Sequence, residues 1–318
     1  MPTMCRKIIF NHTHHKKIAV LFKGDDNMFG KKLCINLTSK FAVSIYEQPA
    51  FVKKAGFDGV FWCTAENDDD LIYKKVCAAG LEVQSLHAPY GGAADMWLDG
   101  ITEDDNEKTR KAEKQLIDCV HSCVKYGAPV MVAHTFIGFD DVPHIPTDAG
   151  FERYGRVIDE AEKNGVKIAF ENTEGEEYLA ALLKRFVDRK NVGYCWDSGH
   201  EMCYNGSRDL LAFYGDRLFA THINDNLGVK SPEGIITWHD DLHLPPFDGI
   251  ADWNYNAERL AKCGFEGSLT FELKTASIPD RHENDEYAEM SAERFFAEAY
   301  KRACRVGSLV MRAEKARK

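Results

Sequence analysis

The chain has 318 residues, a net charge of −10 and 44% hydrophobic residues, a composition that is typical of a globular protein with a large core. The negative charge argues against broad nucleic-acid binding, although it leaves room for a local basic groove. No apolar run approaches the about 20 residues of a membrane span, so no membrane partner is expected.

The ten cysteines follow no disulfide or metal-binding spacing. Cys119 and Cys123 stand four residues apart on a predicted helix, on the same side as Leu116, Val120 and Val124, which favours core packing over a metal or redox role. Free cysteines at this density are typical of a reducing compartment, and the N-terminus shows no apolar signal region followed by a cleavage site. We therefore expect a cytoplasmic protein.

Residues 1–31 are mixed and basic, and they are predicted as an N-terminal extension of the folded domain. His12, His14 and His15 lie close together in this segment. A solvated extension is favoured over a metal-binding tail, because a short histidine-rich stretch is only a compositional signal.

From residue 32 onward, short apolar runs alternate with amphipathic stretches. The predicted strands cover residues 33–38, 58–63, 81–87, 129–135, 167–172, 192–197, 218–223 and 267–273. The predicted helices lie near residues 45–55, 68–79, 103–126, 148–164, 176–190, 207–215, 252–263 and 284–306. Glycines follow five of these helices, where a left-handed cap is common. They are Gly56, Gly80, Gly127, Gly165 and Gly264.

Eight strands that alternate with eight helices predict an α/β fold, a single (β/α)8 TIM barrel over residues 32–318. A doubly wound open sheet is the alternative, but the chain shows no glycine-rich phosphate loop for it. No linker rich in Pro, Gly or Ser divides the series. Two long loops, 88–102 and 224–251, follow strands on the face where barrels carry active sites, and such loops often act as lids.

Four of the predicted strands in the second half of the chain end in a residue that metals use as a ligand. These residues are Glu171, Asp197, His222 and Glu272. Because parallel strands of a barrel end at the same face, the four side chains can converge there. A buried carboxylate is costly unless it is paired or metal-bound, so a metal site is favoured over four separate structural acceptors. This mixed set suits Mn²⁺, Zn²⁺, Co²⁺ or Mg²⁺.

Five further residues are candidates for substrate contact or for an additional metal. His87 and His134 end the third and fourth predicted strands, and His200 follows Asp197 in Asp-Ser-Gly-His. Asp241 and His243 lie in the second long loop. The alternative for the strand-end histidines is a hydrogen bond to backbone, and the alternative for the loop residues is solvation.

Two tryptophans are candidates for stacking on the apolar face of a sugar ring. Trp62 lies near the end of the second predicted strand and Trp97 in the loop after the third, so both are expected near the mouth of the barrel. Filling of the aromatic core is an equally good interpretation of both residues.

The motifs around these residues resemble the xylose isomerase-like TIM-barrel superfamily. That superfamily includes sugar phosphate isomerases and epimerases, ketose 3-epimerases, inosose dehydratases and the endonuclease IV enzymes of AP endonuclease family 2. The resemblance runs from about Cys34 to Arg305. The motifs that carry it are Leu-His87-Ala-Pro-Tyr, Glu171-Asn-Thr, Asp197-Ser-Gly-His200, His222-Ile-Asn-Asp225, Asp241-Leu-His243-Leu-Pro-Pro-Phe-Asp-Gly and Thr-Phe-Glu272-Leu-Lys.

The resemblance implies a metal held by Glu171, Asp197, His222 and Glu272. In the epimerase-like branch it also implies that the two glutamates act as an acid–base pair and that His200 contacts substrate hydroxyls. In endonuclease IV, all nine candidate ligands match a cluster of three zinc ions, so the ligands alone leave both branches open. Related barrels often pair through their outer helices, which makes a homodimer one expected assembly.

Three segments favour the sugar branch: the loop that ends at Trp253, the Asp-Met-Trp97-Leu-Asp stretch, and Glu272-Leu-Lys274. No stripe of Arg and Lys with interleaved aromatic residues follows the predicted mouth loops, so a nucleic-acid partner is not favoured. The hypothesis is a metal-dependent sugar (or sugar phosphate) isomerase or epimerase that moves a proton next to a carbonyl through an enediolate. The expected partner is a small-molecule sugar.

Three alternatives stay open at the level of sequence. The first is a zinc-dependent abasic-site endonuclease, a phosphodiesterase like endonuclease IV. The second is an inosose-type dehydratase, because abstraction of the same proton can be followed by loss of a β-hydroxyl. The third is a binding or regulatory barrel without turnover, against which the intact pair of Glu171 and Glu272 argues.

Overall fold

The structure is a computed structural model, and it describes residues 29–41, 43–100, 102–139 and 145–318. Apart from residues 29–31, the predicted N-terminal extension lies outside the described residues, and so do its histidines His12, His14 and His15. Among the helices of the described ranges, none has both the length and the apolar character needed to cross a membrane.

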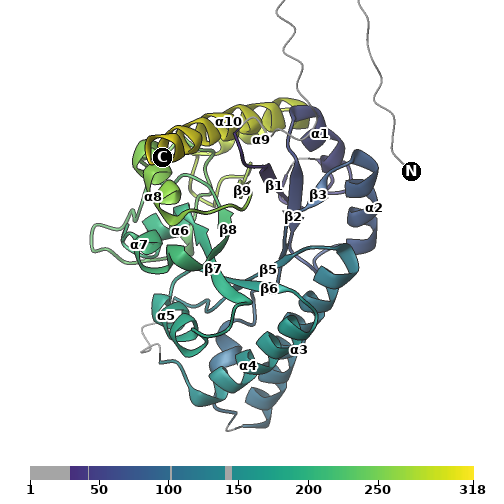
Figure 1. Ribbon diagram of the computed structural model, residues 1–318, viewed down its shortest axis with the longest axis vertical. Coiled ribbons are helices and arrows are strands. Elements are labelled where there is room, and N and C mark those ends of the chain that lie inside the picture. Colours follow the sequence, from purple (N-terminus) through teal and green to yellow (C-terminus); the bar gives the residue numbers. More distant parts are fainter. Residues whose placement is uncertain (1–28, 42, 101, 140–144) are drawn as a thin grey trace, which may run out of the picture.

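The strands form a closed ring at the centre of the molecule (Figure 1). They are β1 (Leu33–Leu37), β2 (Gly59–Trp62), β3 (Glu82–Val83), β4 (Leu86–His87), β5 (Val130–His134), β6 (Lys167–Glu171), β7 (Val192–Asp197), β8 (Leu218–His222) and β9 (Leu269–Phe271). Parallel pairing gives one sheet of order β3-β2-β1-β9 and one of order β4-β5-β6-β7-β8. Single bridges join the sheets, Cys63 with His87 and Ile223 with Phe271. The predicted TIM barrel is confirmed.

One predicted strand is divided. Residues 81–87 were expected to form a single strand, but β3 pairs with β2, whereas β4 pairs with β5. The chain therefore passes from one sheet to the other between Val83 and Leu86, and the two short strands together occupy one position of the eight-membered ring.

Helices lie around the ring of strands (Figure 1). The α-helices are α1 (Gln48–Ala55), α2 (Asp69–Ala79), α3 (Glu103–Tyr126), α4 (Asp148–Lys163), α5 (Glu176–Arg185), α6 (Ser198–Cys203), α7 (Leu210–Tyr214), α8 (Trp253–Cys263), α9 (Asp285–Ala288) and α10 (Ala292–Ala316). Short 3-10 helices are η1 (Ala94–Trp97), η2 (Gly215–Arg217) and η3 (Trp238–Asp240). The predicted glycine caps are confirmed at Gly80, Gly127 and Gly264, which are left-handed.

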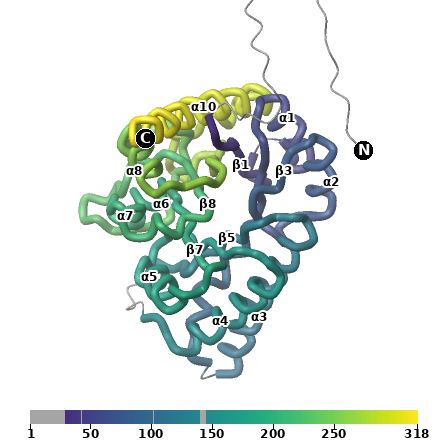
Figure 2. The backbone as a smooth tube through the Cα atoms, in the orientation of Figure 1, coloured from purple at the N-terminus to yellow at the C-terminus, as the bar shows by residue number. Residues whose placement is uncertain are grey.

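The last predicted helix, 284–306, is two helices. The break between α9 and α10 occurs at Ser291, whose side chain accepts a hydrogen bond from the backbone N–H of Arg294 and so caps α10. Helix α10 then continues to Ala316 and packs against both α1 and α8 (Figure 2). The first and last helices of the barrel are therefore held side by side.

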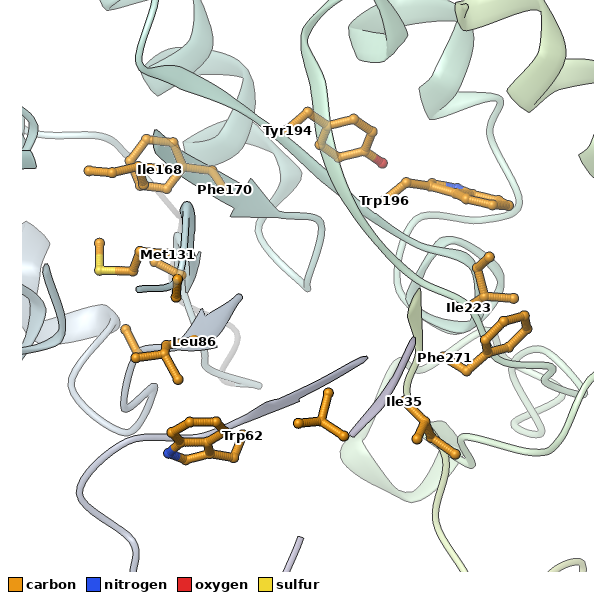
Figure 3. Close-up of a cluster of buried hydrophobic side chains, with 14 of the residues drawn as sticks. Ile35, Trp62, Leu86, Met131, Ile168, Phe170, Tyr194, Trp196, Ile223 and Phe271 are labelled. Carbon is orange, nitrogen blue, oxygen red and sulfur yellow. The ribbon is translucent and has the colours of Figure 1, made fainter. Parts of the chain in front are cut away.

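Strand side chains alternate between two separate cores. Large residues such as Phe170, Tyr194 and Trp196 are at most 1% exposed, and Figure 3 shows this set pointing outward from the strands, toward the helices. The alternate positions carry small side chains that form a second cluster inside the ring: Val130, Val132, Ala169, Cys195 and Ala220. Since side chains alternate along a strand, the residue two positions after each of these also points inward.

The same alternation directs the side chains of the candidate ligands toward the inside of the ring. His134 follows Val132 by two positions on β5, Glu171 follows Ala169 on β6, and His222 follows Ala220 on β8. Asp197 follows Cys195 in the same way on β7. Small apolar residues therefore fill the interior of the ring, and ionisable residues close its carboxyl end.

The prediction that Cys119 and Cys123 pack in the core is confirmed, since both side chains are at most 1% exposed. Val124, which was expected on the same face of α3, is 51% exposed instead. All cysteines within the described ranges are free thiols, in agreement with the absence of a disulfide spacing.

Candidate metal centre

The predicted ligands meet at one end of the barrel. His87, His134, Glu171, Asp197 and His222 are the last residues of β4, β5, β6, β7 and β8. Glu272 comes directly after β9. Because all strands are parallel, these six residues share the carboxyl end of the ring.

His222 is the centre of a first group of ligands. Its Nδ1 atom lies 2.9 Å from Oε1 of Glu171 and 3.0 Å from Oε2 of Glu272. The side chains of His222 and Glu171 are fully buried, whereas that of Glu272 is 23% exposed. Phe61 stacks on the His222 ring, with centroids 4.5 Å apart and planes within 9°, so the imidazole is held in one orientation.

The second oxygen of Glu171 faces two further imidazoles. Its Oε2 atom lies 3.2 Å from Nε2 of His87 and 3.4 Å from Nε2 of His134. The other ring nitrogen of His87 lies 2.6 Å from the carbonyl oxygen of Ala88, which fixes the ring. Tyr90 stacks on His134 at 5.0 Å. Glu171 is thus surrounded by histidines from three other strands.

Asp197 is both a strand end and a helix cap. Its Oδ1 atom accepts a hydrogen bond from the backbone N–H of His200, in the first turn of α6, and its Oδ2 atom accepts one from Nδ2 of Asn224. A Cβ atom on Gly199 would overlap the Asn224 side chain, so the glycine in Asp-Ser-Gly-His lets Asn224 approach. Asp197 therefore has a fixed position before any ion binds.

A second group lies beside the first and combines α6 with the long loop after β8. Oδ1 of Asp241 lies 3.3 Å from Nε2 of His200 and 2.9 Å from Nε2 of His243. Its other oxygen accepts a hydrogen bond from Nζ of Lys274 at 2.9 Å. The groups adjoin, because Nδ1 of His200 is 3.6 Å from Oε1 of Glu171.

Charges in the first group change the pKa values of its members. Burial by itself would raise the pKa of Glu171, but the surrounding imidazoles, His222 first, hold it well below its usual value. Burial would lower the pKa of His222, yet its neighbours, including Glu171 and Glu272, raise it well above its usual value. The protonated imidazole of His222 thus offsets the charge of the carboxylates, and a cation that bound here would displace its proton.

The second group shows the same balance. Burial would raise the pKa of Asp241, but His243, Lys274 and His200 hold it well below its usual value. Burial would lower the pKa of His200, but the carboxylates of Asp197 and Asp241 raise it. Asp197 of the first group differs from these residues, because burial outweighs its charged neighbours and raises its pKa to about 6.

The residues fit a divalent cation in three overlapping sets. One ligand atom per residue lies within 4.8 Å of the others in each of the sets His87–Glu171–His222, His200–Asp241–His243 and Glu171–Asp197–His222–Glu272. Buried ring nitrogens of two ligands, Nε2 of His222 and Nδ1 of His134, have no hydrogen-bond partner. Buried carboxylates and unsatisfied imidazole nitrogens at such distances are the donor set of a mixed oxygen and nitrogen metal site.

A cavity of about 520 Å³ opens above the two groups. Its lining includes His87, His134, His200, Asp241, His243 and Glu272. Glu171, Asp197 and His222 are absent from the lining and are 0% exposed, so they lie beneath its floor. Of the two predicted acid–base glutamates, only Glu272 faces the cavity.

The prediction that Trp62 and Trp97 stack on a substrate is wrong. Trp62 is fully buried on the outer side of β2, where it packs against Tyr126 and donates a hydrogen bond to Asp69. Trp97 is 4% exposed and lies over Gly150, where a Cβ atom would overlap its ring. Both residues fill the aromatic core, which was the alternative interpretation.

Several cavity residues were not predicted. Phe61 could have been found from the alternation of β2, because Phe61 must point inward if its neighbour Trp62 points outward. Tyr90 belongs to the Leu-His-Ala-Pro-Tyr motif, but nothing in the sequence indicates that it contacts His134. Glu174 lines the cavity from a loop and Trp238 from the start of the short helix η3, and no pattern in the sequence indicates either of them.

Comparison with known proteins agrees with this architecture. The model of a family described as xylose isomerase-like TIM barrel matches residues 49–298. The chain is also 29% identical to the uncharacterized protein y4fM of Sinorhizobium fredii, over 70% of this chain and 78% of that protein.

Solved structures of the same fold include an IOLI protein with a binding zinc atom, at 21% identity and a TM-score of 0.65, over 88% of this chain and 98% of that chain. An L-ribulose 3-epimerase matches at 14% identity and a TM-score of 0.65, over 90% and 97% of the two chains. A fusion of a xylose isomerase-like TIM barrel with 4-hydroxyphenylpyruvate dioxygenase matches at 16% identity and a TM-score of 0.66, over 90% of this chain. This chain spans only 44% of that fusion protein. At these identities the structures show a shared fold.

Proposed function

This chain belongs to the family of xylose isomerase-like TIM barrels, and we propose that it is a metal-dependent isomerase or epimerase that acts on a sugar. The observation that carries the proposal is the approach of Glu171 and Glu272 to the same nitrogen of His222, at 2.9 and 3.0 Å, under a cavity of about 520 Å³. The names of two structural neighbours, an L-ribulose 3-epimerase and an IOLI protein with zinc, support a sugar substrate and a metal.

In this proposal, the metal is held by Glu171, Asp197, His222 and Glu272. Three carboxylates and one imidazole suit Mn²⁺, Co²⁺, Mg²⁺ or Zn²⁺. When bound, such an ion supplies Lewis-acid stabilisation of the negative charge that develops beside a substrate carbonyl. The buried hydrogen bonds of Asp197 to Asn224 and to the start of α6 keep its carboxylate aimed at this position.

We assign the removal of the carbon-bound proton to Glu272, because it faces the cavity while Glu171 lies beneath the floor. Burial would raise the pKa of Glu272, but His222 and His243 outweigh burial and lower it. The side chain is therefore an anion at neutral pH and can accept a proton.

Glu171 is the second member of the pair. In an epimerisation, Glu171 would pass to the opposite face of the same carbon a proton taken from the protonated imidazole of His200, whose Nδ1 lies 3.6 Å from its Oε1, while Glu272 keeps the proton that it removed. In an isomerisation, Glu272 could return the proton itself to the adjacent carbon. His200 and His243 also line the cavity, and we propose that they hold substrate hydroxyl groups by hydrogen bonds.

Deuterium incorporation tests the proposal. The protein, loaded with Mn²⁺ or Zn²⁺, is incubated in D₂O with a panel of ketoses, aldoses and inososes, and carbon-bound deuterium is followed by NMR. We expect exchange at the carbon next to the carbonyl of at least one sugar. The absence of exchange across the panel, with metal content confirmed by elemental analysis, would show that the proposal is wrong.

A second candidate function is favoured by one specific observation, the additional set His200–Asp241–His243 next to the first. Together with His87 and His134, it offers ligands for more than one ion, which suits a zinc-dependent phosphodiesterase that acts at abasic sites in DNA. About three zinc ions per chain together with nicking of an abasic duplex would establish this second function in place of the first.

A further inference from the structure

The lining of the cavity combines two kinds of side chain. Its ionic part consists of the candidate ligands together with charged residues that include Lys40, Glu66 and Glu174. Its apolar part includes Ile137, Phe139, Tyr204, Trp238 and Ile278, which together we term the apolar rim.

Every member of the apolar rim is carried by a loop or helix that also carries a candidate ligand. Ile137 and Phe139 follow His134 at the end of β5, and Tyr204 follows His200 at the end of α6. The other two, Trp238 and Ile278, lie in the chain segments that hold Asp241 and Glu272. The rim is therefore positioned by the same segments that position the floor.

One wall of the cavity is a continuous series of rings. The ring of His200 lies 5.1 Å from that of Tyr204, and the ring of Tyr204 lies 5.8 Å from that of Phe139. The series starts at the floor and ends at the opening, where Phe139 is 40% exposed. Trp238, 48% exposed, also belongs to the opening. Large aromatic side chains exposed around a cavity mark a binding surface, because water contacts them at a cost that a ligand removes.

The volume of the cavity also favours a ligand that is larger than a free sugar. Its volume of about 520 Å³ lies within the range of about 300–1,000 Å³ that holds drug-sized ligands. A free hexose is considerably smaller than such a ligand. A sugar whose carbonyl lies over the metal ligands and whose hydroxyls contact the charged part of the lining would leave the apolar rim unfilled.

We propose that the substrate is a sugar derivative that carries an aromatic or other flat apolar substituent, with the sugar over the metal-ligand floor and the substituent between the rings of the apolar rim. This inference rests on the proposed function for the placement of the sugar. It adds a substrate class, an aryl-substituted sugar in place of a free sugar, and it assigns Phe139 and Trp238 as residues that determine specificity.

The test uses pairs of ligands that differ only in the substituent. Mn²⁺-loaded protein is titrated by calorimetry with 6-O-benzyl and 6-O-methyl ethers of glucose, galactose, mannose and fructose, all of which keep the carbonyl carbon free. We expect at least one benzyl ether to bind about tenfold more tightly than its methyl counterpart, since one stacked ring is worth about that factor. Equal affinities within every pair, or no measurable binding of any benzyl ether, would overturn the proposal.

Substitutions in the apolar rim test which residues produce the preference for an aryl substituent. Phe139→Ala and Trp238→Ala should each reduce the ratio of aryl to methyl affinity toward one, and Trp238→Tyr should restore most of it. Phe213→Ala removes an aromatic side chain that is 61% exposed on α7 and does not line the cavity, so it should leave the ratio unchanged. A ratio that neither rim variant alters would also overturn the proposal.

Light scattering distinguishes an apolar rim that binds ligand from one that is covered by a second copy of the chain. Deuterium exchange tests the proposed reaction separately. If the rim is covered by a second copy of the chain, light scattering will show a dimer that Trp238→Ala or Phe139→Ala dissociates, and the aryl preference will be absent. Deuterium exchange with free sugars, measured on the same samples, tests the proposed function independently. Exchange with free sugars but no aryl preference would remove only the substrate class, whereas aryl preference without exchange on any sugar would remove only the reaction.

Discussion

The floor and the apolar rim of the cavity are built in opposite ways. At the centre of the floor are the buried strand-end side chains of Glu171, Asp197 and His222, which pairing with neighbouring strands holds in place. The rim consists of side chains in loops and at helix ends, and two of its three aromatic members, Phe139 and Trp238, are exposed. The barrel therefore fixes the chemistry at the strand ends, whereas the loops determine which molecule reaches it.

The largest effect is expected from the floor. Glu272→Gln keeps the size of the side chain but removes its ability to accept a proton, so deuterium exchange should fall by about 10²- to 10⁴-fold. Exchange is measured by NMR at equal metal content, with Glu266→Gln on the exposed surface as a matched control. Undiminished exchange in Glu272→Gln would contradict the assignment of this residue as the base.

The two tryptophans Trp97 and Trp238 distinguish core from rim. Trp97→Ala should cost about 3–5 kcal/mol in free energy of unfolding, because it leaves a cavity among Tyr154, Tyr178 and Phe151. Trp238→Ala should change that free energy by less than about 0.5 kcal/mol, because its side chain is 48% exposed. Urea unfolding measures both values. Similar costs for the two variants would mean that the rim is part of the folded core.

Asp225 links the floor to the apolar rim, because its carboxylate binds the long loop that follows β8 by hydrogen bonds. Its Oδ1 accepts hydrogen bonds from the backbone N–H groups of Asn226 and Ala251. Its Oδ2 accepts from the N–H of Phe247 and from Nε1 of Trp253, both at 2.9 Å. Asparagine would place an NH₂ group against two of these donors, so Asp225→Asn should cost about 2–4 kcal/mol.

The cost of Asp225→Asn is read from urea unfolding, and faster proteolysis within residues 224–251 should accompany it. Asp252→Asn is the control, because Asp252 is the N-cap of α8 and asparagine caps a helix about as well as aspartate. Equal stabilities of the two variants would argue that the four contacts of Asp225 are individually weak.

The smallest effect concerns Glu174, a buried carboxyl in the cavity wall whose oxygen accepts a hydrogen bond from the N–H of Gly138 at 2.7 Å. Burial raises its pKa. A raised pKa in the folded state gives a contribution to stability that is present at low pH and is lost as the pH rises through the folded pKa. Glu174→Gln should therefore be more stable than the parent at pH 7, by about 1 kcal/mol, and equally stable near pH 4. Chelator-treated protein is used at both values, and a difference independent of pH would contradict the burial of a charge.

Much of the floor could be predicted from the sequence, because a strand end is visible as the point where an apolar run meets a polar residue. Glu171, Asp197 and His222 each follow such a run directly. The parallel order of the barrel then brings them together without any knowledge of loops. The contact of Asp241 with His200 depends on the path of a long loop, and only the resemblance to a known family indicated it.

The direction in which a side chain points was the main error. Trp62 and Trp97 were expected near the mouth because of their positions along the chain, but alternation on β2 directs Trp62 to the helices and gives the inward position to Phe61. A shift of one residue exchanges core and cavity in a strand. Trp238 could not be predicted, because its exposure depends on the fold of the loop around it.

The two sheets meet along two junctions, which we term seams. A single β-bridge joins each seam, Cys63 with His87 at the first and Ile223 with Phe271 at the second. His87, His134, Glu171, Asp197 and His222 belong to the sheet that contains β4 to β8, whereas Glu272 follows β9 of the other sheet. An ion held by Glu272 together with Glu171 and His222 would cross the second seam and act as a cross-link in the wall of the barrel. Metal loading would then slow amide hydrogen exchange at that seam first, at Ile223 and Glu272, whose N–H groups bond across it. The ion would complete the closure of the barrel as well as serve its chemistry.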